Sequence, residues 1–340
     1  MLRTALGPLL LARLEDPGVA EVMLNPDGRV WVDRFEGGQI DAGLTVSPED
    51  AERILRLVAH HVAAEIHAGR PQLSAKLPGT GERFEGWMPP IVTAPTFAIR
   101  KPASLLFSFD DYVRDGVMTE REGQVLAAAV RNRDNILVAG QTSSGKTTLG
   151  NTLLSEMART GDRVIIAEDL PELKCAAQNQ VAMNTSDGVV SMTDLVRSAL
   201  RLRPDRIIIG EVRGPEALDL IKAWGTGHPG GVATLHAGSA LGALLRLEQL
   251  IQEAVVTVPR GLIAETIDVI AVLAGRGRQR RLIDLVRLEG RGPTAPTSSA
   301  PPETLKPPTP DIVEGDGLVS TSLALPRAYA SGLAVPCAPS

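Results

Sequence analysis

The chain has 340 residues, of which 44% are hydrophobic and 22% charged, so it is long enough for two globular domains with sizeable cores. A net charge of −5 (35 basic and 40 acidic residues) and an aromatic content of 3% argue against direct nucleic-acid binding. The two cysteines, Cys175 and Cys337, exclude a disulfide scaffold and fit a reducing cytoplasm, and no apolar run reaches the ~20 residues that span a bilayer.

Residues 1–108 are predicted to form a smaller N-terminal α+β domain of sensor-like type, because helical and strand patterns alternate along them. The chain opens with an amphipathic helix that lacks the cleavage pattern of a signal peptide. A second helix is expected from Ser47, with Ser as N-cap and Pro48 at the first position, to about His67. The predicted strands are Val19–Leu24, Arg29–Asp33, Arg83–Trp87 and Thr96–Arg100.

Residues 109–290 are predicted to form an α/β domain, because helical segments separate several of its strands. Its strand candidates are Asn135–Ala139, Arg163–Ala167, Gln180–Met183 and Arg206–Ile209. The first, second and fourth are continuous runs of Ile, Val, Leu and Ala, as expected of strands buried on both faces of a largely parallel sheet. Ala240–Glu253 has the periodicity of an amphipathic helix. Residues 291–340 are rich in proline, so they are predicted to form a disordered tail.

A phosphate-binding loop follows the first of these strands. Residues 140–148 read GQTSSGKTT, which is the Walker A pattern in the position behind a strand that it requires. The predicted nucleotide-binding residues are Gly140, Gln141, Thr142, Ser143, Ser144, Gly145, Lys146, Thr147 and Thr148. Lys146 is expected to contact the β- and γ-phosphates of a nucleoside triphosphate, and Thr147 to offer its hydroxyl to Mg²⁺.

Two further strands end in acidic residues, at the edge where open α/β sheets bind their ligands. Glu211 follows the strand 206–209 and is a Walker B candidate that would hold a Mg²⁺-bound water or polarise the attacking water. Glu168, Asp169 and Glu172 follow the strand 163–167 and could reach the same water or the metal. A solvated acidic loop is the plainer interpretation of these three residues.

Two histidines lie in glycine-rich surroundings, in the segments 227–231 and 234–237. Metal binding lacks a third ligand at a suitable spacing. His236 could instead sense the nucleotide state through a hydrogen bond toward the γ-phosphate or a neighbouring acid. For His228 a structural turn remains the alternative.

Walker A, the acidic box 168–172, Walker B at 207–211 and the histidine box 227–237 occur in an order that resembles the secretion traffic ATPase superfamily. The stretch from Gly210 to Gly231, together with 81–86, Pro89-Pro90 and 99–101, is most similar to the conjugal-transfer ATPases of the TrbB type. The resemblance covers roughly residues 5–290.

The resemblance implies a homo-hexameric ring that hydrolyses ATP with Mg²⁺ and drives type IV secretion, conjugative DNA transfer or pilus biogenesis. It places the ring at the cytoplasmic face of the inner membrane, in peripheral contact with the membrane and with inner-membrane components of the apparatus. Catalytic roles carry over to Glu172, Glu211, His236 and Arg100, the last supplied from the N-terminal domain, and Thr147 and Glu211 become the candidate Mg²⁺ residues. Arg197, Arg201 or Arg203 would contact a phosphate of a neighbouring subunit, or else form ordinary salt bridges on a helix face.

Two departures bear on this interpretation. Ser143 occupies a position where many relatives have glycine, which constrains the loop backbone. The four-cysteine zinc module of pilus-extension ATPases is absent, so pilus-retraction ATPases are the nearer rival branch.

Two alternatives come from other functional classes. They are a nucleotide-gated assembly module with marginal hydrolysis and a DNA-dependent motor.

Overall fold

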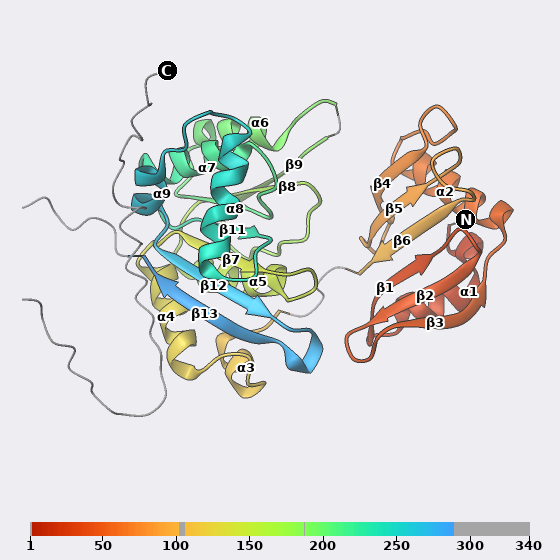
Figure 1. Cartoon of the computed structure of the whole chain (residues 1–340), viewed down its shortest axis with the longest axis horizontal. Helices are drawn as coiled ribbons and strands as arrows, with labels where there is room; N and C mark the ends of the chain where they lie inside the picture. The colour runs from red at the N-terminus through yellow and green to blue at the C-terminus, as the bar shows by residue number, and fades with distance from the viewer. Residues whose placement is uncertain (1, 102–105, 187, 289–340) are drawn as a thin grey trace, which may run out of the picture.

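The computed structural model describes residues 2–101, 106–186 and 188–288; the predicted tail lies outside them. The chain forms two parts, each built on its own β-sheet, as Figure 1 shows. None of the helices in the described residues is both long and apolar enough to cross a membrane. The mixed α/β character expected from the sequence is confirmed.

The N-terminal part is a six-stranded antiparallel sheet in the order β3-β2-β1-β6-β5-β4. Its strands are β1 (Val19–Leu24), β2 (Arg29–Arg34), β3 (Gly38–Thr45), β4 (Gln72–Lys76), β5 (Arg83–Trp87) and β6 (Thr96–Arg100). Two helices, α1 (Leu2–Glu15) and α2 (Pro48–His61), supply apolar side chains to a core that the alternate residues of these strands complete. The strands β5 and β6 have the bounds predicted from the sequence.

Both helices depart from the simplest expectation. α1 contains a non-helical residue, Gly7 (φ 70°, ψ 163°), directly before Pro8, so it is two helical pieces joined at a kink. α2 begins as predicted, with the Ser47 side chain accepting a hydrogen bond from the Asp50 N–H. The prediction that it runs to about His67 is wrong, because the chain turns through a left-handed residue, Ala63 (φ 53°), just after the helix ends.

A row of charged residues crosses the N-terminal sheet on the side away from its helices. Successive cross-strand partners on five adjacent strands are Asp33, Glu21, Arg100, Arg83 and Lys76. Cross-strand partners point to the same face of a sheet, so these five side chains lie next to one another. The first two are acidic and the last three basic; we call this set the charge row.

The C-terminal part is a seven-stranded sheet in the order β13-β12-β7-β11-β10-β8-β9. Its strands are β7 (Ile136–Gly140), β8 (Val164–Glu168), β9 (Gln180–Asn184), β10 (Arg206–Ile209), β11 (Val232–Leu235), β12 (Val269–Ala274) and β13 (Arg281–Arg287). All neighbours pair in parallel except β12 and β13, which form an antiparallel hairpin. The prediction of buried parallel strands at β7, β8 and β10 is confirmed, since every residue of the three is buried.

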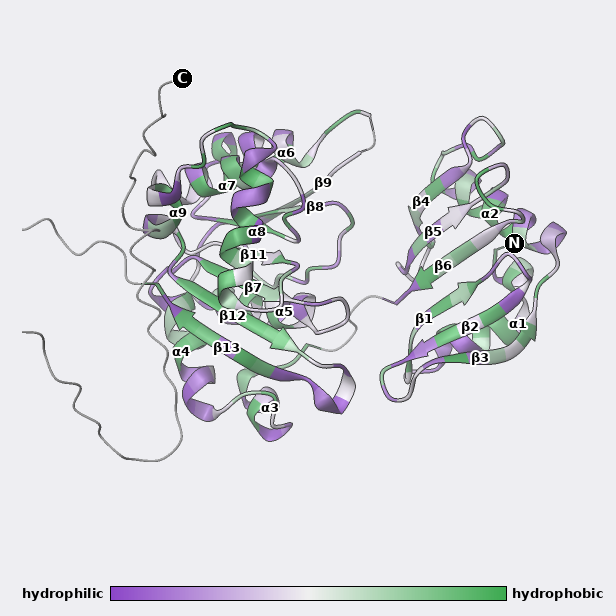
Figure 2. Cartoon of the chain, in the orientation of Figure 1, coloured by the Kyte–Doolittle hydropathy of each residue, from purple (hydrophilic) through white to green (hydrophobic). Residues whose placement is uncertain are grey.

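Helices cover both faces of this sheet, and Figure 2 shows its strands as a hydrophobic layer between them. The helices are α3 (Phe109–Arg114), α4 (Glu120–Arg131), α5 (Lys146–Met157), α6 (Met192–Ala199), α7 (Glu216–Gly225), α8 (Ala240–Gln252) and α9 (Arg260–Thr266), with short 3₁₀ turns at Leu200–Leu202 and Gly277–Gln279. Residues of α3, α4 and α5 pack on one face, and those of α6, α7, α8 and α9 on the other.

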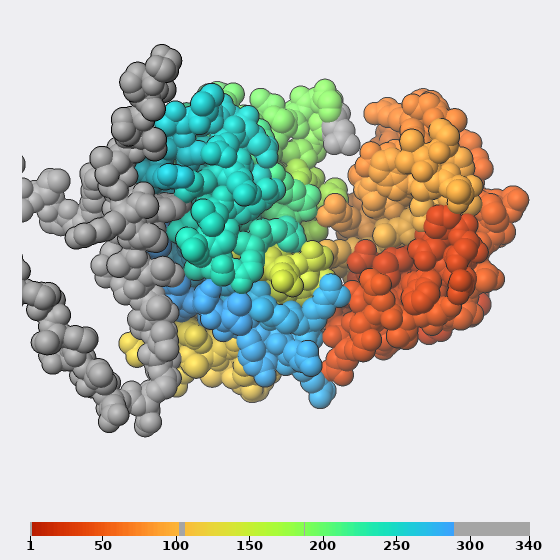
Figure 3. All heavy atoms as spheres, in the orientation of Figure 1, coloured from red at the N-terminus to blue at the C-terminus, as the bar shows by residue number. Residues whose placement is uncertain are grey.

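The two parts touch at both ends of the charge row. The turn between β12 and β13 meets the turn between β2 and β3, where Arg276 lies 3.6 Å from Asp33 and Arg278 lies 2.6 Å from Glu36. Figure 3 shows this hairpin packed against the N-terminal part. At the other end, the Lys76 ammonium donates a hydrogen bond to the carbonyl oxygen of Pro171. The N-terminal sheet is therefore held against the C-terminal part at two separate places.

Candidate functional site

A polar cleft lies at the carboxyl ends of the parallel strands, where the N-terminal part faces the C-terminal part. It is lined by groups from the loop after β7, from the segments after β8, β10 and β11, and from strands β5 and β6. These residues are Arg83, Arg100, Thr142, Ser143, Lys146, Thr147, Glu168, Asp169, Leu170, Glu172, Gly210, Glu211, Arg213, Thr234 and His236. All four residues predicted to be catalytic are therefore in one cleft, beside the loop predicted to bind phosphate.

The loop between β7 and α5 requires its two outer glycines. A Cβ atom on Gly140 would come within 2.4 Å of the Ser144 Oγ and 2.6 Å of the Leu273 carbonyl oxygen. Gly145 caps α5 in a left-handed conformation (φ 97°), and a Cβ there would lie 2.7 Å from the Arg280 guanidinium. The loop thus curls tightly at the N-terminus of α5, and the free N–H groups of that helix end favour an anion.

Lys146 points back over this loop. Its ammonium donates hydrogen bonds to the carbonyl oxygens of Gly140 (3.1 Å) and Gln141 (3.2 Å), and it lies 3.5 Å from Nδ1 of His236. The residue is 8% exposed, and burial lowers the pKa of its ammonium, while the charge of Glu211 opposes that shift. The lysine is therefore a cation held at the mouth of the loop, and no carboxylate of the described residues pairs with it directly.

Ser143 is the strained position of the loop. Its φ of 63° lies in the left-handed region, which costs a residue with a Cβ about 1–2 kcal/mol. The neighbouring Ser144 is buried, and its hydroxyl has no hydrogen-bond partner among the described residues. Position 143 therefore has the left-handed backbone that glycine adopts easily. This fits the glycine that many relatives have there, although this chain has serine.

Ser143→Gly is expected to be close to neutral. Relief of the left-handed strain is offset by the larger conformational freedom of glycine in the unfolded chain, so stability should change by less than about 1 kcal/mol. The affinity for the nucleoside triphosphate predicted from the sequence should stay within about threefold of that of the wild type. Nucleotide titration and chemical unfolding check this, with Ser143→Val as the contrasting variant, since a β-branched residue is disfavoured at this φ. A tenfold loss of affinity in Ser143→Gly would instead assign the Ser143 hydroxyl a direct contact.

The acidic residues after β8 divide into two kinds. Glu168 is 4% exposed, and its Oε1 accepts hydrogen bonds from the backbone N–H groups of Glu172 (3.0 Å) and Leu173 (2.9 Å). Burial raises the pKa of the Glu168 carboxyl. Glu172 instead turns its carboxylate toward the phosphate loop, with Oε2 3.4 Å from the Thr147 hydroxyl. Glu168 therefore supports the loop that carries Glu172. A solvated acidic loop, the plainer interpretation of the sequence, does not describe either residue.

Glu211 is engaged by two basic groups. Its Oε2 accepts hydrogen bonds from the Arg213 guanidinium, and its Oε1 lies 2.5 Å from Nε2 of His236. Arg213 also lies 3.5 Å from Asp169, so one guanidinium links the segments after β8 and β10. Burial lowers the pKa of His236, the Lys146 charge lowers it further and Glu211 opposes both. The imidazole is therefore neutral near pH 7, where it can exchange hydrogen bonds as donor and acceptor.

Arg83 and Arg213 line the cleft, although the sequence suggested a role for neither. The predicted strands 83–87 and 96–100 would have placed Arg83 opposite Arg100 if paired as an antiparallel hairpin, as they do in the structure. Arg213 depends on the turn after β10, which no periodicity reveals. With Lys146 and Arg100, these arginines give the cleft four cationic side chains, which face the four carboxylates of Glu168, Asp169, Glu172 and Glu211. This mixture suits an anionic ligand that binds together with a cation.

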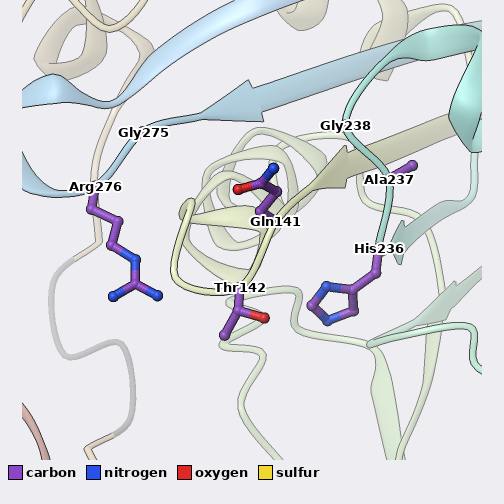
Figure 4. Close-up of a pocket in the computed structure, with 7 residues that line it drawn as sticks. All are labelled: Gln141, Thr142, His236, Ala237, Gly238, Gly275 and Arg276. Carbon is purple, nitrogen blue, oxygen red and sulfur yellow. The ribbon is translucent and has the colours of Figure 1, made fainter.

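A neighbouring hollow lies beside the phosphate loop, and Figure 4 shows its lining. Arg276 and His236 face it from opposite sides, with Gln141 and Thr142 of the loop between them. His236 and Thr142 therefore border both the hollow and the cleft.

The remaining candidates lie elsewhere. His228 contacts the Ala223 carbonyl oxygen through Nδ1 (3.3 Å) and does not line the cleft, which agrees with the structural alternative. Arg197 forms a two-pronged pair with Asp219, the ordinary helix-face salt bridge, and Arg201 and Arg203 do not line the cleft either. Within the described residues, no group of three or more His, Cys, Asp or Glu side chains is arranged to hold a metal ion by itself.

The chain belongs to the type II/IV secretion system protein family, whose model matches residues 70–281. This confirms the resemblance seen in the order of the four motifs.

Within that family, the chain is 46% identical over 291 residues to a protein described as conjugal transfer protein TrbB from Rhizobium radiobacter, covering 85% of this chain and 90% of the relative. It is 33% identical over 310 residues to the type IV secretion system protein PtlH of Bordetella pertussis, covering 80% and 91%. The crystal structure of the pilus retraction motor PilT with bound ADP superposes with a TM-score of 0.57 at 21% identity, covering 78% of this chain and 77% of PilT, a likeness of fold.

Proposed function

We propose that this protein is a Mg²⁺-dependent ATPase that energises conjugative DNA transfer through a type IV secretion apparatus. The observation that carries the proposal is the convergence of Lys146, Thr147, Glu172 and Glu211 in one cleft. Relatives 46% and 33% identical, named for conjugal transfer and type IV secretion, supply the biological context.

The residues of the cleft fit a nucleoside triphosphate with its metal. The loop has no space for a Cβ at Gly140 and has a left-handed backbone at Gly145, and it opens onto the N-terminus of α5 beside the Lys146 ammonium. Thr147 and Glu211 would hold the metal, directly or through water. When bound, Mg²⁺ neutralises charge on the β- and γ-phosphates. The buried and partnerless hydroxyl of Ser144 is a further group that a ligand could satisfy.

Each residue then has a role in hydrolysis. Lys146 would bind the β- and γ-phosphates, and Glu172 would orient and deprotonate the attacking water as general base. His236, held between Lys146 and Glu211, would report on the γ-phosphate. Arg100, with Arg83 beside it on the N-terminal sheet, would stabilise the negative charge that develops in the transition state.

The organisation proposed from the sequence accompanies this function. Residues 1–108 would be a PAS-like N-terminal domain, 109–290 a RecA-like ATPase domain, and 291–340 a Pro-rich tail. We also propose a homo-hexameric ring bound to inner-membrane components at the cytoplasmic face. Because arginines of one part reach the phosphate loop of the other, movement between the two parts would couple hydrolysis to mechanical work.

Phosphate release from ATP by the purified chain, with and without Mg²⁺, tests the catalytic part of the proposal, and native mass in the presence of an ATP analogue tests the ring. Mg²⁺-dependent turnover is expected. Tight ATP binding with ring formation and no turnover would favour the alternative, a nucleotide-gated assembly module. DNA transfer restored by this chain in a donor whose own traffic ATPase gene is deleted tests the biological role, and restoration of pilus retraction instead would favour the rival branch.

A further inference from the structure

The third basic residue of the charge row, Lys76, contacts the loop that carries Glu172. It is the last residue of β4, in the N-terminal part, and its ammonium donates a hydrogen bond to the Pro171 carbonyl oxygen in the C-terminal part. Pro171 directly precedes the carboxylate proposed as general base. Lys76 is not among the residues that line the cleft, although its strand partner Arg83 is.

The loop between β8 and β9 is fixed from the C-terminal part at several points. Glu168 accepts the N–H groups of Glu172 and Leu173, and the side chain of Asn151 accepts the N–H of Lys174 at 2.8 Å. Before residue 171, Asp169 accepts a hydrogen bond from the Thr185 hydroxyl (3.2 Å) and lies 3.5 Å from Arg213, so the C-terminal part holds the loop on both sides of Pro171. The carbonyl of Pro171 is held instead by a residue of the other part, so the position of this loop depends on both parts.

The charges around Lys76 favour the same arrangement. The carboxylates of Glu168 and Glu172 both act to raise the pKa of the Lys76 ammonium, although burial outweighs them and lowers it. The ammonium is half-buried, and the cost of burying its charge is offset by the hydrogen bond to a carbonyl oxygen and by the two acidic neighbours. Moving the N-terminal part away would remove the cation from the two carboxylates.

Lys76 is also tied to the cleft arginines. It is the cross-strand partner of Arg83, which is the partner of Arg100, so the three cations occupy adjacent strands of one sheet. Any rigid movement that brings Arg83 and Arg100 to the phosphate loop brings Lys76 to Pro171 at the same time. The cleft arginines and the Lys76 contact are thus mechanically linked.

We propose that Lys76 is a positioning residue that sets the carboxylate of Glu172 by holding the Pro171 carbonyl, so that the hydrolytic site is complete only when the N-terminal part is closed. The inference rests on the proposed ATPase function. It makes Lys76 act through Glu172, without contact to the nucleotide. Domain closure and base positioning would then be one event.

The test compares Lys76→Met and Lys76→Arg in the full chain with Lys222→Met, a matched control that removes an exposed lysine of α7. Lys76→Met is expected to lower kcat by about 10- to 100-fold, since a displaced catalytic group loses this much. Its affinity for ATP, measured with a fluorescent analogue, should stay within about threefold of the wild type. Lys76→Arg should recover most of the rate, and Lys222→Met should match the wild type.

A double-mutant cycle separates action through Glu172 from independent action. Adding Lys76→Met to Glu172→Gln should cause no further loss of kcat. The proposal would be overturned if the losses of kcat in the two single variants multiplied in the double variant. It would also be overturned if Lys76→Met had an unchanged kcat, with or without a weaker affinity for ATP. Thermal unfolding shows whether Lys76→Met is folded; if it is not, the same comparison is made with Lys76→Gln, which keeps a neutral donor. A wild type without turnover would refute the ATPase proposal itself, and a Glu172→Gln variant as fast as the wild type would refute the role of Glu172 as general base.

Discussion

Replacing Lys146 by alanine is expected to reduce ATP hydrolysis at least about 10²- to 10³-fold, because the variant loses the cation that meets the β- and γ-phosphates. The structure places this ammonium over the carbonyl oxygens of Gly140 and Gln141, 8% exposed, at the mouth of the phosphate loop. Weaker nucleotide binding should accompany the loss. Phosphate release and nucleotide titration on the same preparation measure both effects.

Lys222→Ala serves as the control for this variant, since it removes an exposed lysine from the same part of the chain. It should hydrolyse ATP at the wild-type rate. The unfolding midpoint of Lys146→Ala should stay near that of the wild type, because the two carbonyl oxygens that accept from the lysine are in its own loop and its contact with His236 is long, at 3.5 Å. Normal turnover in Lys146→Ala would exclude the proposed mechanism.

Glu172→Gln is expected to separate binding from hydrolysis. The amide keeps the shape of the side chain and its contact with Thr147 but cannot take a proton from water, so kcat should fall by about 10²- to 10⁴-fold. Affinity for ATP should remain within a few fold of the wild type. Single-turnover hydrolysis and equilibrium titration give the two numbers.

Glu168→Gln is the matched control, with the same substitution four residues earlier in the same loop. An amide oxygen can still accept the N–H groups of Glu172 and Leu173, so this variant should keep most of the activity. If Glu172→Gln instead failed to bind ATP, its role would be to maintain the loop, and the general base would have to be sought elsewhere.

The sheet was predictable from the sequence where the strands are long apolar runs. β7, β8 and β10 were recognised because they are buried on both faces. β11 was missed because its four residues lie inside a glycine- and histidine-rich segment. β12 follows the apolar residues of α9 so closely that the run does not distinguish a helix from a strand.

The residues of the candidate site also divide into those that the sequence predicts and those that it does not. Lys146, Thr147, Glu172, Glu211 and His236 lie in short motifs whose spacing is fixed by a strand and the turn after it, so the sequence identified them. Arg83 has its partner on a neighbouring strand, and Lys76 has its partner across the contact between the two parts. Arg213 pairs with Glu211 two residues away and with Asp169 after β8. Their positions depend on strand register, on one turn and on the docking of two sheets, which a single sequence does not encode in any periodic pattern.

The charge row gives the N-terminal sheet the geometry of a lever. Asp33, at one end, is paired with Arg276, and Lys76, at the other, reaches Pro171. Four interstrand spacings separate the two residues, about 19 Å at ~4.8 Å per strand. A rotation of about 10° around the Asp33 end would carry Lys76 through roughly 3 Å at this radius, enough to break its hydrogen bond. Arg100 lies halfway along and Arg83 three-quarters of the way, so they would travel about half and three-quarters as far in the same movement. One small opening would therefore release the loop that carries Glu172 and begin to withdraw both arginines.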